Sequence, residues 1–231
     1  MLEVTFNGTT LAPPVYVEDV RRAILPRIVH NTAQIPGRIG AYFGGRTVDE
    51  RIIEIDLRLI TPPGETEWAR LSNLAAVLFT DEPKRLEISD RPGVYELAMV
   101  DGSPSWDVFA YTGSATLTFH NYDGVYHASD VTIGTTNSGT VQTPFIMRGT
   151  STAEAITVLS DRTGELLSFN GVPIGATVEI DTGAETITVN GVLGMQYDLA
   201  ISDYPWLQPG ANTMTVSGLS DVTYEHRARF L

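Results

Sequence analysis

Short runs of alternating hydrophobic and polar residues fill the first half of the chain, as in β-strands with one buried face. One helical pattern interrupts them, because Trp68, Leu71, Leu74 and Leu78 recur at helical spacing after the breaker at residues 61–64. The first half therefore predicts a sheet with one helix packed on it. The predicted strands are residues 2–6, 51–60, 85–89, 93–100 and 115–120.

The second half has no helical period and is rich in Gly, Thr and Ser. Turn signals such as Asn170-Gly171 and Asn190-Gly191 separate short alternating runs at spacings of about 8–12 residues, which is typical of a β-sandwich. The predicted strands are residues 142–147, 155–160, 166–170, 177–180, 185–189 and 212–217.

The run 222–231 alternates strictly and carries Arg227 and Arg229, which suit the mixed first half better than the acidic second half. We therefore expect the final strand to return to the N-terminal domain. The predicted fold is mainly β. Its N-terminal domain, residues 1–125 plus 222–231, is a sandwich or barrel-like sheet with one α-helix, and its C-terminal sandwich spans residues 126–221.

Composition is that of a globular protein, with 42% hydrophobic and 19% charged residues among 231. Cysteine is absent, which excludes disulfides, thiolate metal sites and cysteine nucleophiles. The net charge of -13 argues against a chain that wraps nucleic-acid phosphates, and we expect no sequence-specific nucleic-acid binding. No apolar run approaches the roughly 20 residues of a membrane span. We expect no membrane insertion and, since the N-terminus lacks a signal-peptide pattern, no secretion by that route.

No catalytic, metal or cofactor motif emerges. His30, His120, His127 and His226 show none of the short spacings that gather metal ligands, and the nucleophile-elbow, phosphate-loop and dinucleotide patterns are missing. Adjacent acids such as Asp49-Glu50 are best interpreted as solvated groups. We therefore expect a protein that is not an enzyme and needs no cofactor.

The stretch from His30 to Arg51 contains four glycines, a proline, two aromatic residues and three arginines. Loops this long inside a compact domain are usually functional or disordered, and aromatic and arginine side chains are enriched in interface cores. The stretch predicts an extended arm that wraps a neighbouring subunit. A plain surface loop is the alternative.

Several motifs carry a resemblance to a known family. Gly40, Gly44-Gly45-Arg46 and Asp49-Glu50-Arg51 lead into the strand 52–59, followed by the helix and by residues 85–95, and this order resembles the N-terminal domain of the siphophage distal tail protein (Dit) family. Residues 178–182, 189–191, 205–218 and 227–231 are similar to the galectin-like C-terminal sandwich of that family.

The resemblance implies a structural hub of the tail tip or baseplate. It implies a homo-hexamer, a ring that joins the tail tube (major tail) protein to the tail-associated hub or lysin protein, with tape measure and receptor-binding proteins as further partners in host attachment. The location would be the virion tail tip, after assembly in the host cytoplasm.

In that setting the arm, at about residues 31–50, corresponds to the family's belt. We expect Arg46 or Arg51 to meet acidic groups of the neighbour. The full set of expected contacts between subunits is Ile35, Arg38, Tyr42, Phe43, Arg46, Asp49 and Arg51.

Two other functions stay open. A carbohydrate-binding sandwich for host glycans would stack sugars on aromatic rings, for which Trp106, Tyr197, Tyr204 and Trp206 are candidates. A phage-associated hydrolase would need a paired-acid or nucleophile site, and the sequence shows none.

Overall fold

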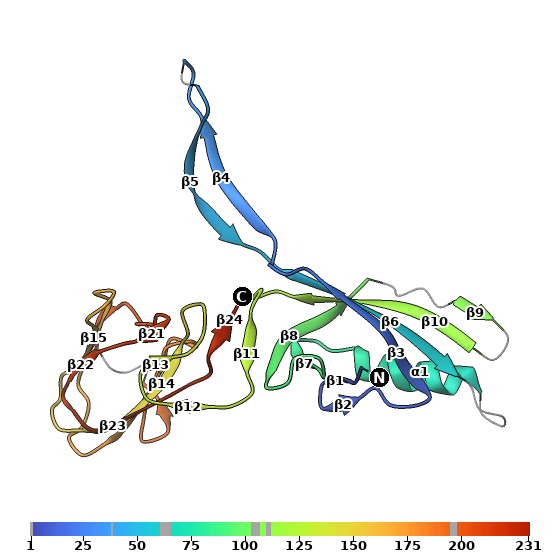
Figure 1. The fold of residues 1–231 in the computed structure, drawn as a ribbon. Coiled ribbons are helices and arrows are strands. Elements are labelled where there is room, and N and C mark those ends of the chain that lie inside the picture. The colour runs from blue at the N-terminus through green and yellow to red at the C-terminus, as the bar shows by residue number, and fades with distance from the viewer. Residues whose placement is uncertain (1, 38, 61–65, 103–106, 110–111, 195–197) are drawn as a thin grey trace. The chain divides into compact units, whose positions relative to one another are not determined.

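The computed structural model describes residues 2–37, 39–60, 66–102, 107–109, 112–194 and 198–231. The chain forms two compact units, Met1–Tyr126 with Leu231 and His127–Phe230. Both are built from antiparallel strands, and the described residues contain a single α-helix (Figure 1). The prediction of a mainly β protein with one helix is confirmed.

The sheet of the first unit runs in the order β2-β1-β7-β8-β10-β6-β3. An isolated bridge between Leu2 and Val17 connects the β1 side of this sheet to β3, so the sheet closes on itself at that point. Its strands are β1 (Val4–Phe6), β2 (Thr9–Thr10), β3 (Val15–Arg22), β6 (Arg51–Ile60), β7 (Lys84–Ile88), β8 (Val94–Asp101) and β10 (Thr112–Asn121), with β9 (Asp107–Phe109) paired to β10.

The core of this unit lies on one face of the sheet, because side chains alternate in and out along each strand. In β6 every second side chain, from Arg51 to Leu59, is buried. Helix α1 (Glu67–Leu78) packs Leu74 and Leu78 against this core. The buried apolar residues are Val4, Phe6, Leu11, Val17, Ile53, Ile55, Leu57, Leu86, Ile88, Ala98, Leu117 and Phe119.

The second unit contains one sheet in the order β12-β23-β14-β17-β18-β19 and another in the order β20-β16-β15-β22. One core, which includes Phe145, Phe169 and Leu207, collects buried residues from both sheets, as in a sandwich. The strands are β12 (Thr132–Ile133), β14 (Phe145–Ser151), β15 (Ile156–Ser160), β16 (Leu166–Asn170), β17 (Thr177–Asp181), β18 (Thr186–Val189), β19 (Val192–Leu193), β20 (Asp198–Ser202), β22 (Met214–Ser217) and β23 (Leu219–His226). A further pair joins β13 (Thr136–Asn137) to β21 (Gly210–Ala211).

The C-terminal run matches its prediction only in its last residues. Residues up to His226 belong to β23, which pairs with β14 inside the second unit, where Phe145 is the partner of His226. Residues 222–226 therefore do not return to the first domain. The last strand, β24 (Arg229–Phe230), pairs with β11 (Tyr126–Ala128), and β11 also pairs with β8. The final strand therefore joins the sheet of the first unit, as predicted.

Candidate assembly interface

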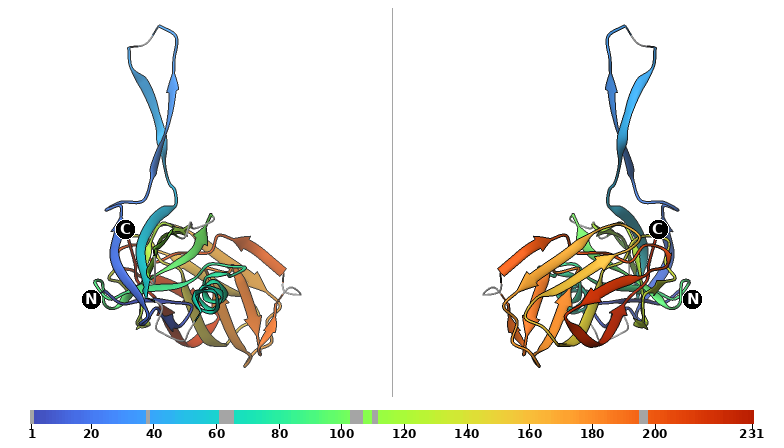
Figure 2. Two further views of the ribbon diagram at one scale, coloured as in Figure 1. Left: turned by 90° about the vertical axis from the view of Figure 1, so that its right-hand side faces the viewer. Right: turned by 90° about the vertical axis from the view of Figure 1, so that its left-hand side faces the viewer.

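The segment expected as a long loop is a β-hairpin. Strands β4 (Ile28–Gln34) and β5 (Ala41–Val48) pair only with each other and extend away from the sheet of the first unit (Figures 1 and 2). We call residues 27–48 the arm. Gly37 and Gly40 occupy left-handed backbone conformations in the connection between the strands, where other residues would be strained.

A bulge sets which side chains share a face of the arm. His30 is the partner of Arg46 and Thr32 is the partner of Phe43, because the register shifts between Asn31 and Thr32. As a result, the rings of His30 and Phe43 lie 5.8 Å apart on one face. Gly44 is the extra residue, because Gly45 pairs with Asn31, and Gly45 has a positive φ of 126° that suits a bulge.

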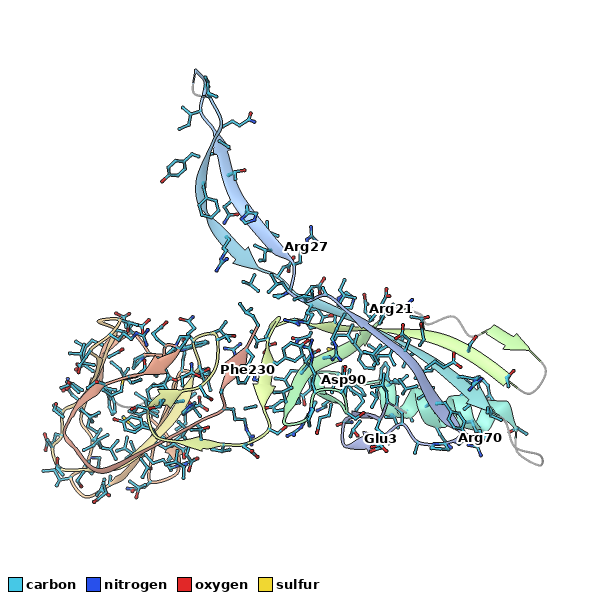
Figure 3. The ribbon with its side chains drawn as sticks, viewed as in Figure 1. Glu3, Arg21, Arg27, Arg70, Asp90 and Phe230 are labelled. Carbon is cyan, nitrogen blue, oxygen red and sulfur yellow. The ribbon has the colours of Figure 1, made fainter. Side chains whose placement is uncertain are left out.

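Large apolar side chains of the arm are exposed on both faces. Tyr42 is 54% exposed and Phe43 is 57% exposed, although the register places them on opposite faces; Ile35 and Ile39 near the turn are also exposed. An isolated two-stranded hairpin is only marginally stable in water, and contiguous exposed apolar surface usually meets a partner. Figure 3 shows side chains along both strands, with Arg27 at the base.

The base of the arm is fixed by the backbone. Asp49 N donates to Arg27 O at 2.7 Å and Arg27 N donates to Glu50 O at 3.2 Å. The Asp49 side chain accepts from Glu50 N at 3.0 Å and lies 3.9 Å from the Arg27 guanidinium. Among the expected contact residues, Asp49 therefore makes its contacts within its own chain at the arm base.

The predicted contact of Arg51 with a neighbouring subunit is not compatible with its position, because the residue is only 1% exposed. Its Nη1 donates to the Tyr126 hydroxyl at 2.6 Å, its Nη2 donates to Gly124 O at 3.3 Å, and its guanidinium lies 4.3 Å from the centre of the Tyr126 ring. Arg91 lies over the same ring at 4.6 Å. A residue in this position cannot meet a neighbouring subunit, so the prediction for Arg51 is wrong.

A buried polar cluster surrounds Arg51. Burial raises the pKa of Glu96, and the Tyr126 hydroxyl and the guanidinium groups of Arg51, Arg22 and Arg91 oppose that shift. Burial also raises the pKa of Tyr126, with the Glu96 carboxylate adding to it. This cluster anchors the start of β6, directly after the arm.

His120 is another residue near the arm base that sequence reasoning did not assign. Its Nδ1 lies 2.8 Å from Glu50 Oε2 and its Nε2 lies 3.2 Å from Asp101. The three residues come from distant parts of the sequence, so spacing along the chain carries no signal of this arrangement.

A groove runs between α1 and strands β8 and β10. Its volume is about 560 Å³, and we call it the α1 groove. Phe79, at the end of the helix, is 82% exposed, and Trp68 on the first turn is exposed too, although its spacing had placed it on the packed face. The lining residues are Leu71, Leu74, Ala75, Leu78, Phe79, Thr80, Met99, Val100, Gly102, Ala115 and Leu117.

The aromatic candidates of the second unit have different surroundings. Trp206 lines a hollow of about 540 Å³ together with Asp181, Glu225 and Arg227; its Nε1 donates to Thr182 O at 3.2 Å. Tyr204 packs against the sandwich core instead, and burial raises its pKa. The predictions for Arg38, Trp106 and Tyr197 fall outside the described residues.

Within the described ranges, no cluster of His, Cys, Asp or Glu side chains could hold a metal ion. In the same part of the chain, no helix has the length and apolar character needed to cross a membrane.

Comparisons with known proteins agree with this architecture. The model of a phage tail protein RIFT-related domain matches residues 14–121, and that of the siphovirus-type tail component, C-terminal domain, matches residues 138–230. The chain is a structural protein of a phage tail or baseplate. It belongs to the distal tail (Dit) family of siphophages, which confirms the resemblance seen in the sequence.

Solved structures share the fold over the full length. The crystal structure of SPP1 Dit (gp 19.1), described as a paradigm of the hub adsorption apparatus in phages that infect Gram-positive bacteria, has a TM-score of 0.84 at 20% identity, and 100% of each chain is covered. A chain of the phage P2 baseplate in its activated conformation with Ca has a TM-score of 0.57 at 13% identity, covering 99% of this chain and 98% of that one. The baseplate activated with Sr gives 0.54 at 13% identity, covering 98% and 97%. A search of curated proteins found no match.

Proposed function

We propose that six copies of this chain form a ring at the tail tip, which joins the tail tube protein to the tail-associated hub protein and so to the host-adsorption apparatus. Tape measure and receptor-binding proteins are further proposed partners. The role is structural and requires no catalysis, and the ring forms in the host cytoplasm before it becomes part of the virion.

The arm is the observation that supports this proposal. Tyr42, Phe43, Ile35 and Ile39 are exposed on a hairpin that pairs with no other described strand of its own chain. An arm of one subunit that contacts a different surface of the next gives a head-to-tail interface, which closes into a ring when the rotation is suitable. Arg46, which is exposed on the arm, remains the proposed partner for acidic groups of the neighbour.

Native mass spectrometry and electron microscopy test the proposal together. The wild-type chain is expected to give a hexamer mass and rings, alone or with the tail tube protein. In a shortened variant, Gly-Gly replaces residues 30–46 and joins Val29 to Thr47, which are partners in the hairpin and can close on a two-residue turn.

The shortened variant is expected to fold but to stay monomeric, because the base contacts of Arg27 and Asp49 are retained. Ile133→Ser, at a position 79% exposed in the second unit, provides a control that should assemble normally. Rings formed by the shortened variant would refute the role of the arm, and a wild-type monomer under all conditions would refute the ring.

Carbohydrate binding is a second candidate function, favoured by the hollow beside Trp206. Asp181, Glu225, Arg227 and Arg229 line it; Glu225 also pairs with Arg148, and the Arg229 guanidinium lies 5.6 Å from the centre of the Trp206 ring. A neutral saccharide fits such a mixed site better than a charged ligand does. Fluorescence titration, described below, tests this candidate.

A further inference from the structure

The α1 groove leaves apolar surface of the first unit uncovered. Leu71, Leu74 and Leu78 from the helix face Val100 and Leu117 from the strands across it. These side chains adjoin the core, so water in the groove contacts the same apolar cluster that stabilises the unit. A surface of this kind is stabilised when another apolar segment fills it.

Charge indicates which segment fills it. The arm carries Arg27, Arg38 and Arg46 and no acid; because Arg27 lies beside Asp49 at the arm base, the arm beyond its base has a formal charge of +2. The helix segment 65–83 carries four acids against Arg70 alone, and Lys84, which follows it, pairs with Glu82, so the formal charge of residues 65–84 is -2. These acids are Glu65, Glu67, Asp81 and Glu82. The arm is therefore a basic apolar segment, and the groove lies in an acidic apolar surface, within a chain of net charge -13.

The arm of the same chain does not reach this groove. The arm joins the sheet at Arg51, and in the register of β6 and β10 the groove residues Leu117 and Ala115 lie opposite Ile55 and Leu57, about 13–20 Å along β6 from that point. The arm itself extends away from the sheet (Figures 1 and 2). The arm and the α1 groove are thus separate surfaces of one subunit, as a head-to-tail contact requires.

We propose that the arm of a second copy of this chain docks in the α1 groove, with its apolar side chains Ile39, Tyr42 and Phe43 against the helix and its arginines beside the acids of segment 65–83. This inference rests on the proposed ring and names the surface that receives the arm. It also accounts for the exposure of Phe79, which would be covered only in the assembly.

Cysteine cross-linking tests the contact directly, because the chain contains no cysteine of its own. Tyr42→Cys in one preparation is mixed with Phe79→Cys in another, and a short bismaleimide is added. A covalent dimer that contains both variants is expected. Tyr42→Cys mixed with Ile133→Cys is the control and should give no more than background; equal yields from both mixtures would overturn the proposal.

A charge placed in the groove gives a second measurement. Ala75→Arg puts a cation where the basic arm would dock, and Ser72→Arg puts the same side chain at an exposed position of the helix outside the groove lining. Ala75→Arg is expected to weaken assembly at least tenfold by sedimentation, with Ser72→Arg unchanged and both variants folded by circular dichroism.

The outcomes separate the two proposals. If the shortened arm prevents assembly while Ala75→Arg assembles like the wild type, the arm docks elsewhere and the groove proposal is wrong, although the ring stands. If the shortened variant assembles normally, the arm has no role in assembly and the groove proposal is wrong, although the ring stands. A wild-type chain that stays monomeric would refute the ring itself.

Discussion

Replacing Arg51 by alanine tests whether this residue stabilises the first unit from within or contacts a neighbouring subunit. The guanidinium donates to the Tyr126 hydroxyl at 2.6 Å and to Gly124 O at 3.3 Å and stacks on the Tyr126 ring. A hydrogen bond to a charged group contributes roughly 1.5–3 kcal/mol, and removal of one member of a buried charged cluster costs about 3–5 kcal/mol. We expect Arg51→Ala to lower the free energy of unfolding of the first unit by about 3–5 kcal/mol.

Differential scanning calorimetry of the whole chain measures this effect. At about 4 °C for each kcal/mol, the expected fall in Tm of the first unit is roughly 12–20 °C. The second unit, which does not contain Arg51, provides an internal reference whose transition should stay in place. The loss is large because a domain has only about 5–15 kcal/mol of net stability.

Arg46→Ala is the matched control, since it removes the same side chain from an exposed position on the arm. Its effect on Tm should correspond to less than about 0.5 kcal/mol, as for most surface substitutions. If Arg51→Ala unfolds like the wild type and loses assembly instead, the burial argument is refuted and the original interface prediction is restored.

Three other predictions address separate sites. His226 is 4% exposed, and burial lowers its pKa, so the unfolded chain takes up a proton near pH 6.5 that the folded chain does not. The free energy of unfolding of the second unit, measured by urea titration, should therefore fall as the pH drops below about 6.5. His226→Gln should make this pH dependence weaker. Gly124 has a φ of 68°, and an added Cβ would lie 2.7 Å from Asp49 O, so Gly124→Ala should lower the free energy of unfolding by roughly 2 kcal/mol or more in thermal unfolding. Gly8→Ala, with a similar φ but open space around the added Cβ, should lower it by about 1 kcal/mol in the same experiment. For the carbohydrate candidate, N-acetylglucosamine at millimolar concentration should change the fluorescence of the wild type and of Trp68→Ala but not of Trp206→Ala, and an identical response in all three would contradict a site beside Trp206.

Strands with one buried face were predictable because their hydrophobic period is strong. The prediction for residues 51–60 matches β6, where buried and more exposed side chains alternate from Arg51 to Ile60. The helix prediction matches α1 for the same reason, as Leu74 and Leu78 pack on the core. By contrast, β3 (Val15–Arg22) was not predicted, since its burial pattern alternates poorly and a bulge interrupts its register.

The arm was predicted as an extended element but not as a hairpin. Strand periodicity reflects one buried and one solvated face, and both faces of β4 and β5 are largely exposed in the single chain. The residues from His30 to Gln34 are therefore mostly polar and give no alternating signal. A segment that acquires its buried face only from another molecule lacks the pattern on which strand prediction depends.

Arg46 and Arg51 show why residue type alone did not define the site. Both arginines lie in the same glycine-rich stretch, and both fit the composition of an interface. Arg51 begins β6 opposite Asn121, in a row of inward-facing positions that continues with Ile53 and Ile55, so the register of the sheet buries it. Arg46 lies on a hairpin without a covering layer in its own chain, so the same side chain stays exposed. The start of β6 at Arg51 thus marks a boundary in the sequence. Arg51 itself is buried by the sheet and stabilises the subunit, whereas Arg46, on the arm before it, is exposed and can contact another subunit.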